Sequence, residues 1–446
     1  MNAALPPGPP LPRIVQTAGF MLVGARFLEA CRRRYGDLVT FGTLFDKRFV
    51  MVFDPELVKQ VFKGTPEQLR AGEANALLGP ILGDRSVLLL DGAEHLRHRR
   101  LLAPAFHGQR MLAHTETMRA CADQEIDAWP VGEPFALLGS MQSLTLRVIL
   151  RSVFGYTAGP AEDELRRRLR AMVEPLSRPR GLLMISALVG GRTDRRAARA
   201  FQARKRAVDE ILYAEIARRR GQADLADRED VFSALLLARD EQGEGLTDEE
   251  IRDELLTLLL AGHETTATGL AWTLDLLLHE PRVLEVARRR EDRYLDAVVK
   301  EALRIRPVIP GIGRVVREAP LRLAGYEVPV GVELNPSIRT IHRRADLYPN
   351  PSRFDPERFL ADDAPDTYTW IPFGGGTRRC LGASFALTEM RIVLARILER
   401  AQLRAADPKP ATAQFRAITL SPKGGVRVLL TAPPAPGAPD PRGQPP

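Results

Sequence analysis

Apolar residues recur at helical spacing along most of the chain, and the clearest case runs from Thr247 to His279. Thr247 and Glu250 form a capping box that marks a helix start, and Pro281 limits the far end. At 1.5 Å per residue such a helix would span about 50 Å. Because it is apolar on most faces, we expect it to pass through the middle of the protein.

Extended segments are few and lie toward the two ends of the chain. Residues 38–53 are typical of two short strands around a turn near Asp46, and Pro55 begins a helix. A second extended region covers residues 314–334, and residues 418–430 have the pattern of a hairpin. The sequence therefore predicts a mainly α protein with a small β region, in which the terminal regions meet.

Proline-rich segments form both ends of the chain. Residues 1–13 and 433–446 are expected to be extended and poorly packed, so we predict one folded domain over residues 14–432. The apolar run from Ile14 to Gly24 is about half a membrane span and is interrupted by Gln16, so no transmembrane anchor is expected.

Composition narrows the functional classes. The 446 residues are 45% hydrophobic and 27% charged, which is typical of a globular protein. The net charge of +8 favours acidic partners, but the arginines are dispersed and aromatic residues make up only 6%, so no nucleic-acid binding is predicted. Cys31, Cys121 and Cys380 are too scattered for a disulfide framework or a paired zinc site, which indicates a reducing cytoplasm.

Two segments are candidate sites, the first because it breaks the rules of packing and the second because it places a thiol at a helix start. The sequence AGHETT, residues 261–266, puts a carboxylate and hydroxyls at the centre of the predicted long helix, although buried polar groups cost several kcal/mol unless they are satisfied. The sequence FGGGTRRCLG, residues 373–382, is a glycine-rich loop that brings Cys380 to the start of a helix. Backbone N–H groups there would favour the thiolate, and the glycines would admit a flat ligand.

A lone thiolate cannot complete a tetrahedral metal site. It could supply one axial ligand to a metal held in a macrocycle, and haem with cysteine ligation is the known chemistry of that kind. The alternative is a buried structural cysteine.

The loop resembles the haem loop of the cytochrome P450 superfamily, of the soluble bacterial type. The pattern F-x-x-G-x-R-x-C-x-G is matched by Phe373, Gly376, Arg378, Cys380 and Gly382. The resemblance implies the P450 fold, with haem b buried between the long central helix and the cysteine-bearing loop and helix. It makes Cys380 the iron ligand and pairs Arg378 with a propionate. It also places Phe373 beside the sulfur and lets the helix after Gly382 pass near the ring.

The same resemblance assigns roles elsewhere. It gives Glu264 and Thr265 the acid and alcohol positions that deliver protons during oxygen activation; the alternatives are a helix N-cap or a threonine bonded back to its own helix. His95 and Arg99, four residues apart, would bind a propionate, as would Arg314. The alternative for this basic group is a solvated helix face.

A second set of residues is implied to be structural. Glu301 and Arg304 in KEALRIRP, with Arg358 in FDPERF, resemble the family's E-x-x-R network. Two planar guanidinium groups can chelate one carboxylate from two sides.

The P450 fold would build the substrate pocket from apolar residues, which bind lipids, terpenoids, steroids or polyketides largely through burial. These residues are Leu78, Ile81, Leu89, Ala261, Val308, Ile309 and Ile312. The glycine-bounded segment 181–191 is expected to be a mobile lid or a loop that touches a membrane.

The resemblance implies a monooxygenase that inserts one oxygen atom from dioxygen into an apolar substrate, by hydroxylation or epoxidation. No dinucleotide fingerprint is present, so electrons would come from a ferredoxin or flavodoxin with its reductase. An acidic donor would be steered by basic residues on the cysteine side, namely Arg97, Arg100, Arg110 and Arg379. The alternatives are a peroxide-driven peroxygenase or isomerase, and a non-catalytic haem or ligand sensor.

Overall fold

A computed structural model describes most of the chain, and its strands and helices agree with the predicted mainly α class. The predicted turn at Asp46 and the predicted lid at 181–191 lie outside the described residues. The described ranges are 5–44, 48–106, 109–175, 195–289, 292–362 and 364–436.

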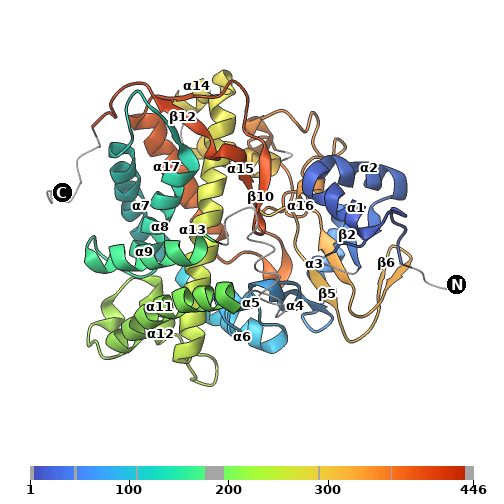
Figure 1. Cartoon of the computed structure of the whole chain (residues 1–446), viewed down its shortest axis with the longest axis horizontal. Coiled ribbons are helices and arrows are strands. Elements are labelled where there is room, and N and C mark those ends of the chain that lie inside the picture. The colour runs from blue at the N-terminus through green and yellow to red at the C-terminus, as the bar shows by residue number, and fades with distance from the viewer. Residues whose placement is uncertain are drawn as a thin grey trace.

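The long central helix is α13, Asp248–Leu278, and it begins at the predicted capping box, in which Thr247 and Glu250 each bond the other's backbone N–H. It runs through the molecule in Figure 1 and is packed by α8 (Leu137–Ser152), α15 (Asp292–Ile305) and α17 (Ala383–Arg400). Because these helices enclose it, most of its residues are buried.

The remaining helices lie around this bundle or beside the β strands (Figure 1). In chain order they are α1 (Arg13–Ala18), the π-helix η1 (Gly19–Val23), α2 (Ala25–Tyr35), α3 (Pro55–Lys63), α4 (Ala71–Ala74), η2 (Ala76–Leu78), α5 (Gly79–Leu82), α6 (Gly92–Leu102), η3 (Ala103–Phe106), α7 (Gln109–Asp127), α9 (Pro160–Val173), α11 (Arg195–Arg220), η4 (Leu225–Asp227), α12 (Val231–Leu237), α14 (Pro281–Arg289), α16 (Ile338–Ile341), η5 (Pro356–Phe359), η6 (Gly376–Arg378) and η7 (Lys423–Gly425). Among the described residues no helix combines the length and the apolar character needed to cross a bilayer.

The largest sheet has the strand order β1-β2-β8-β5-β3. Its strands are β1 (Leu38–Phe41), β2 (Phe49–Val52), β3 (Leu69–Arg70), β5 (Arg314–Val316) and β8 (Glu333–Pro336). The predicted N-terminal hairpin is present, with Leu38 opposite Val52, and β2 runs parallel to β8. A separate hairpin joins β6 (Leu321–Leu323) to β7 (Tyr326–Val328). Apolar residues of the large sheet, of this hairpin and of α3 form a second core, separate from the one around α13.

The C-terminal strands correct two predictions. Residues 418–430 do not form one hairpin, because β11 (Thr419–Pro422) pairs with β10 (Ala413–Arg416), whereas β12 (Arg427–Leu430) pairs with β4 (Pro134–Ala136) and β9 (Leu403–Ala405). Between β11 and β12, Gly424, Gly425 and Val426 all have positive φ and redirect the chain. The predicted meeting of the terminal regions is present only in part, because β2 pairs with β8, whereas β10, β11 and β12 belong to other sheets.

The proline-rich start is better packed than predicted. Pro6 and Pro9 are buried, and Thr40 donates its backbone N–H to the carbonyl of Pro7 at 3.0 Å and its hydroxyl to that of Pro6 at 2.6 Å. The prediction of poor packing is therefore wrong for Pro6 and Pro9, whereas Pro7, Pro10, Leu11 and Pro12 are exposed. The domain limits at 14 and 432 stay a prediction.

Candidate active site

The cysteine loop is shaped by glycines. Gly374 and Gly376 have φ values of 67° and 64°, and a Cβ atom on Gly376 would lie 2.0 Å from the carbonyl oxygen of Phe62. Only glycine tolerates both constraints. The loop closes through the backbone N–H of Cys380, which donates to the carbonyl of Phe373 at 2.9 Å, and α17 begins shortly afterwards. The ring of Phe373 packs edge-on against Trp370.

The Cys380 side chain is exposed, yet the protein around it still influences its ionisation. Desolvation raises the pKa of the thiol, whereas the backbone N–H of Gly382 and the charges of Arg99 and Arg379 oppose that rise. The groups expected to favour the thiolate are therefore present, but desolvation by the surrounding protein atoms outweighs them and raises the pKa overall. A coordinated metal ion deprotonates such a thiol outright.

Four residues predicted to bind propionates converge from three parts of the chain. His95 and Arg99 lie on α6, Arg314 begins β5, and Arg378 is in the cysteine loop. Burial, followed by the charges of Arg378, Arg99 and Arg314, lowers the pKa of His95 to about 3, so this imidazole is neutral. Its Nδ1 atom is buried and has no hydrogen-bond partner among the described residues. Among the described residues, no carboxylate pairs with His95 in this cluster of cationic side chains.

Arg378 has a partner that the sequence did not indicate. Its Nη2 atom donates to Oδ1 of Asp91 at 2.5 Å and to the carbonyl of Leu90 at 2.6 Å. Asp91 also accepts the backbone N–H groups of Gly72 and Glu73, at 2.9 and 3.0 Å. One carboxylate thus ties the cysteine loop to the starts of α4 and α6.

The middle of α13 faces open space on one side. Ala261 is exposed and Thr265 is partly exposed, although most of this helix is buried. The hydroxyl of Thr265 donates to the carbonyl of Ala261 at 2.6 Å, so the threonine is bonded back to its own helix while its oxygen can still accept a hydrogen bond. A Cβ on Gly262 would lie 2.9 Å from Ile149, so this glycine lets α8 approach α13 closely.

Glu264 turns toward α8 and β10. Its Oε2 atom accepts from Nε2 of Gln142 at 2.7 Å, and its Oε1 atom lies 3.4 Å from Nε of Arg416. Neither partner was anticipated, because both are distant in sequence and no local spacing links them. Next to it, His263 is buried and its Nδ1 atom bonds the carbonyl of Leu259 at 2.6 Å.

The structure brings Glu301, Arg304 and Arg358 together. Arg304 chelates Glu301 through Nε at 2.7 Å and Nη2 at 2.8 Å, and Nε of Arg358 lies 3.4 Å from Oε1 of Glu301. Glu301 also accepts the backbone N–H of Asp355 at 3.0 Å, and Arg304 donates to the carbonyl of His342 at 2.6 Å. Both members of the chelated pair are fully buried. The pair anchors α15 to the segment that leads toward the cysteine loop.

The predicted pocket residues divide between the two cores. Ile81 and Val308 are buried in the core around α13, and Leu78 and Leu89 pack against it. Ile309 and Ile312 pack against the second core, and Ile312 would contact a Cβ placed on Gly374.

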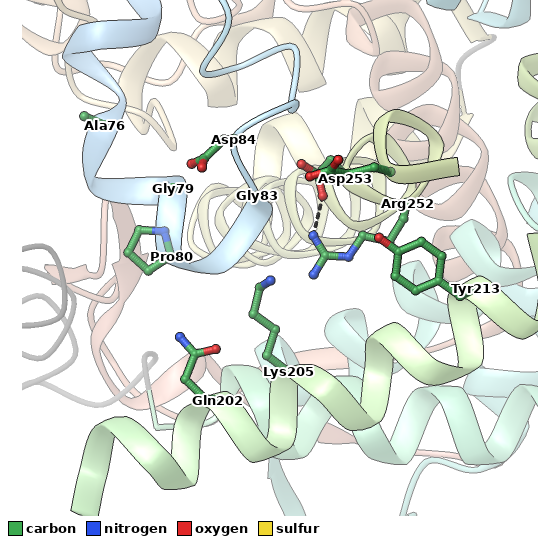
Figure 2. A pocket seen from close by; sticks show the side chains of 11 residues that line it. Ala76, Gly79, Pro80, Gly83, Asp84, Gln202, Lys205, Tyr213, Arg252 and Asp253 are labelled. Carbon is green, nitrogen blue, oxygen red and sulfur yellow. Dashed lines mark hydrogen bonds and ion pairs between the residues drawn. The ribbon is translucent and has the colours of Figure 1, made fainter. Parts of the chain in front are cut away.

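A cavity of about 630 Å³ lies between η2, α5, α11 and the first turns of α13 (Figure 2). Its lining is polar, with Lys205 and Tyr213 on α11 facing Arg252 and Asp253 on α13. None of the seven predicted pocket residues lines it.

The basic residues expected on the cysteine side differ in their surroundings. Nε of Arg97 is paired with Asp240 at 2.6 Å, and Arg100 with Glu241 at 3.2 Å. Arg379 is exposed and has no ion pair among the described residues. The side chain of Arg110 lies outside the described part of the structure.

Comparison with known proteins identifies the family. The model of the family described as "Cytochrome P450" matches residues 6–428. The chain belongs to the cytochrome P450 family. It is 41% identical to the putative cytochrome P450 135B1 of Mycobacterium tuberculosis strain H37Rv, over 97% of this chain and 92% of that protein. It is 39% identical to the putative cytochrome P450 135A1 of the same strain, over 96% of each.

The fold agrees with this membership. The solved structure of the retinoic acid-bound cyanobacterial CYP120A1 superposes with a TM-score of 0.81 over 96% of this chain and 99% of that one, at 24% identity. The predicted P450 fold is thereby confirmed. As a member of this family, the protein is a haem monooxygenase that uses dioxygen and depends on electron donors.

The residues present fit a haem. An exposed thiol follows the loop, and a buried imidazole nitrogen without a partner lies among cationic side chains suited to propionates. A Cβ on Gly382 would meet no atom within 4 Å, which leaves space at the start of α17 for a flat group.

Proposed function

We propose that this P450 monooxygenase holds haem b through Cys380 and inserts one oxygen atom of dioxygen into an apolar organic substrate. When bound, the haem would supply dioxygen binding and electron transfer. The convergence of His95, Arg99, Arg314 and Arg378, with Arg99 close enough for its charge to act on the exposed thiol of Cys380, is the observation that carries the proposal. These residues would hold the propionates, with His95 acting as a neutral donor.

Proton delivery is assigned to two residues of α13. Thr265 has a hydroxyl on the exposed face of the helix, and its oxygen can accept one hydrogen bond while it donates to Ala261. Glu264 is partly exposed and is oriented by Gln142 and Arg416, so it would take up a proton from outside and pass it inward.

The substrate would be a lipid, terpenoid, steroid or polyketide, hydroxylated or epoxidised. Support comes from the apolar side chains on α5 and around the start of β5, which offer burial and few fixed polar contacts. These residues are Leu78, Ile81, Leu89, Ala261, Val308, Ile309 and Ile312.

Electrons would come from a ferredoxin or flavodoxin with its reductase. Such donors are acidic, and the exposed guanidinium of Arg379, which has no ion pair within the described ranges, lies one residue from Cys380. Arg97 is paired internally and contributes less to this surface than predicted. A location in the cytoplasm stays a prediction from the sequence.

The test is the carbon monoxide difference spectrum of the reduced holoprotein, followed by turnover with a spin-shifting ligand. The wild type should give the band of thiolate-ligated haem, and Cys380→His should keep haem but lose oxygenation. Turnover with reductase, ferredoxin and dioxygen supports the monooxygenase. Turnover with peroxide alone would instead indicate a peroxygenase, and iron held by nitrogen would overturn the ligand assignment.

A further inference from the structure

Three arginine side chains gather near the end of α15 without a carboxylate partner. Arg306 follows α15, Arg339 lies on α16, and Arg343 comes two residues after α16. None of the three forms an ion pair with a carboxylate among the described residues. The Nε atoms of Arg306 and Arg343 are buried and have no hydrogen-bond partner in the described part of the chain. We call these three residues the arginine cluster; charges shielded from water in this way are costly unless a counter-ion is present.

The charges of the arginine cluster repel one another. Burial, followed by the charges of Arg306, Arg339 and Arg304, lowers the pKa of Arg343 to about 10. Burial, followed by the charge of Arg306, also lowers the pKa of Arg339. Arg304 is neutralised by Glu301, but the cluster has no such carboxylate. Because a guanidinium with these pKa values is still protonated at neutral pH, the repulsion persists there.

The protein offsets these charges only in part. The guanidinium of Arg306 lies over the ring of Trp272, 5.0 Å from its centroid, and Asp275 acts on it from beyond ion-pair distance. Nη2 of Arg343 donates to the carbonyl of Ile305 at 3.2 Å, at the C-terminal end of α15. A ring face and a helix end each supply a partial negative charge, which is less than two full positive charges need.

Arg339 faces the start of another helix. A Cβ on Gly24 would lie 3.2 Å from Nη1 of Arg339, and Gly24 is the N-cap of α2. The N-terminal end of a helix carries a partial positive charge, so it adds to the positive potential. No acidic side chain among the described residues acts on Arg339. This arginine is therefore the least compensated member of the cluster.

A small cavity lies beside Arg306 and Arg339. Its volume is about 10 Å³, and Trp272 and Leu420 of β11 complete its lining. Such a volume is about that needed by one water molecule, so it suits a monatomic ion better than a whole phosphate or carboxylate group. The indole N–H of Trp272 already donates to the carbonyl of Leu420 at 2.9 Å. The charged donors left for an occupant are thus those of the arginines.

We propose that the arginine cluster binds one chloride ion, in the cavity between Arg306 and Arg339, with Arg343 adding its charge. Donors from two guanidinium groups would bind the ion, and its negative charge would offset their repulsion. The carbonyl of Val308, two residues after Arg306, accepts the N–H of Leu420 at 2.8 Å. An occupied site would therefore tie the end of α15 and α16 to β11.

Exchange of sodium gluconate for sodium chloride tests the proposal on the full-length holoprotein. At a constant ionic strength of about 0.2 M, the urea midpoint of the wild type should rise with chloride and then level off, as one binding site requires and screening does not. Arg339→Met should weaken chloride binding about tenfold. In gluconate alone this variant should be at least as stable as the wild type, because it removes an uncompensated charge.

Crystals of the holoprotein grown with bromide locate the ion directly. Anomalous scattering should place one bromide against the guanidinium groups of Arg306 and Arg339, and crystals of Arg339→Met should lack it. A bromide bound elsewhere, with this cavity empty, would contradict the assignment.

Arg344→Met is the matched control, because Arg344 is next to Arg343 in the chain but is paired with Asp37 at 3.3 Å and with Asp346. It should lower the midpoint in both salts and keep the wild-type response to chloride. A wild-type midpoint that is equal in both salts, or an undiminished chloride response in Arg339→Met, would overturn the proposal. Stabilisation by sulfate but not by chloride would also overturn it and would assign the cluster to a larger oxyanion.

Discussion

The Nδ1 atom of His98 lies 2.8 Å from Oε1 of Glu254, and this contact joins α6 to α13. The other ring nitrogen lies 3.1 Å from Oε1 of Glu250, so one imidazole lies between two carboxylates of adjacent turns of α13. The helix that carries His95 and Arg99 is thereby fixed to the helix that carries Glu264 and Thr265. Burial lowers the pKa of His98, but Glu254 and Glu250 outweigh it and raise the pKa overall.

This contact predicts a pH-dependent stability. A histidine with a raised pKa stabilises the fold fully below about pH 6.5, and that contribution is lost as the pH rises through the folded-state pKa. We expect His98→Gln to lower the free energy of unfolding by about 3 kcal/mol at pH 6, with a smaller difference at pH 9. Urea unfolding across this range measures it. His279→Gln, at a partly exposed histidine beside Asp275, is the control and should cost less than about 1 kcal/mol.

The buried Glu301–Arg304 pair predicts a large loss of stability. Glu301→Ala would leave Arg304 buried without its carboxylate, which costs about 3–5 kcal/mol. Glu399→Ala, which removes the exposed partner of Arg396, should cost less than about 1 kcal/mol. Chemical denaturation with the haem absorbance as a second probe compares the two. Similar losses for both variants would contradict the structural role of Glu301.

Substitution by alanine should affect stability at one glycine of the cysteine loop and haem affinity at another. Gly376→Ala combines a positive φ with a clash against Phe62 and should cost about 3 kcal/mol. Gly382→Ala meets no atom of the chain, so the apoprotein should unfold as the wild type does while haem affinity falls. Unfolding of apoprotein and haem transfer to apomyoglobin separate these effects. Unchanged haem affinity in Gly382→Ala would remove Gly382 from the haem contact.

The alcohol of Thr265 is expected to couple electron consumption to product. Thr265→Ala should still consume reductant, but most of the electrons should reduce dioxygen to hydrogen peroxide that is released, because the proton relay is broken. Thr266→Ala is the matched control, since its hydroxyl makes the same back-bond, to Gly262 at 2.8 Å, from the buried side of α13. The ratio of product to reductant measures the coupling. Normal coupling in Thr265→Ala would exclude the relay role.

Charge reversal at Arg379 tests the donor surface. Arg379→Glu should slow reduction by an acidic ferredoxin about tenfold at low salt without changing the carbon monoxide spectrum. Arg322→Glu, at an exposed side chain of β6, should be reduced by the ferredoxin at the wild-type rate. Stopped-flow reduction at two salt concentrations is the measurement, since screening should reduce the difference.

Patterns within a few residues of each other were enough to predict several parts of the fold and of the candidate site. The capping box at Thr247 and Glu250, the glycine loop before Cys380 and the spacing of Glu301 and Arg304 each lie within a few residues, and each appears where expected. Short-range geometry fixes such features, so the sequence alone revealed the long helix, the cysteine loop and, through them, the family.

Contacts between distant residues were decided by the tertiary structure. Asp91 beside Arg378, Gln142 and Arg416 beside Glu264, and Glu254 beside His98 are separated by more than 100 residues in the chain. No spacing encodes these pairs, because they depend on how helices and strands pack. The same reason explains the orientation of α1: its pattern showed an apolar run, but only the hydrogen bonds of Gln16 turned that run outward.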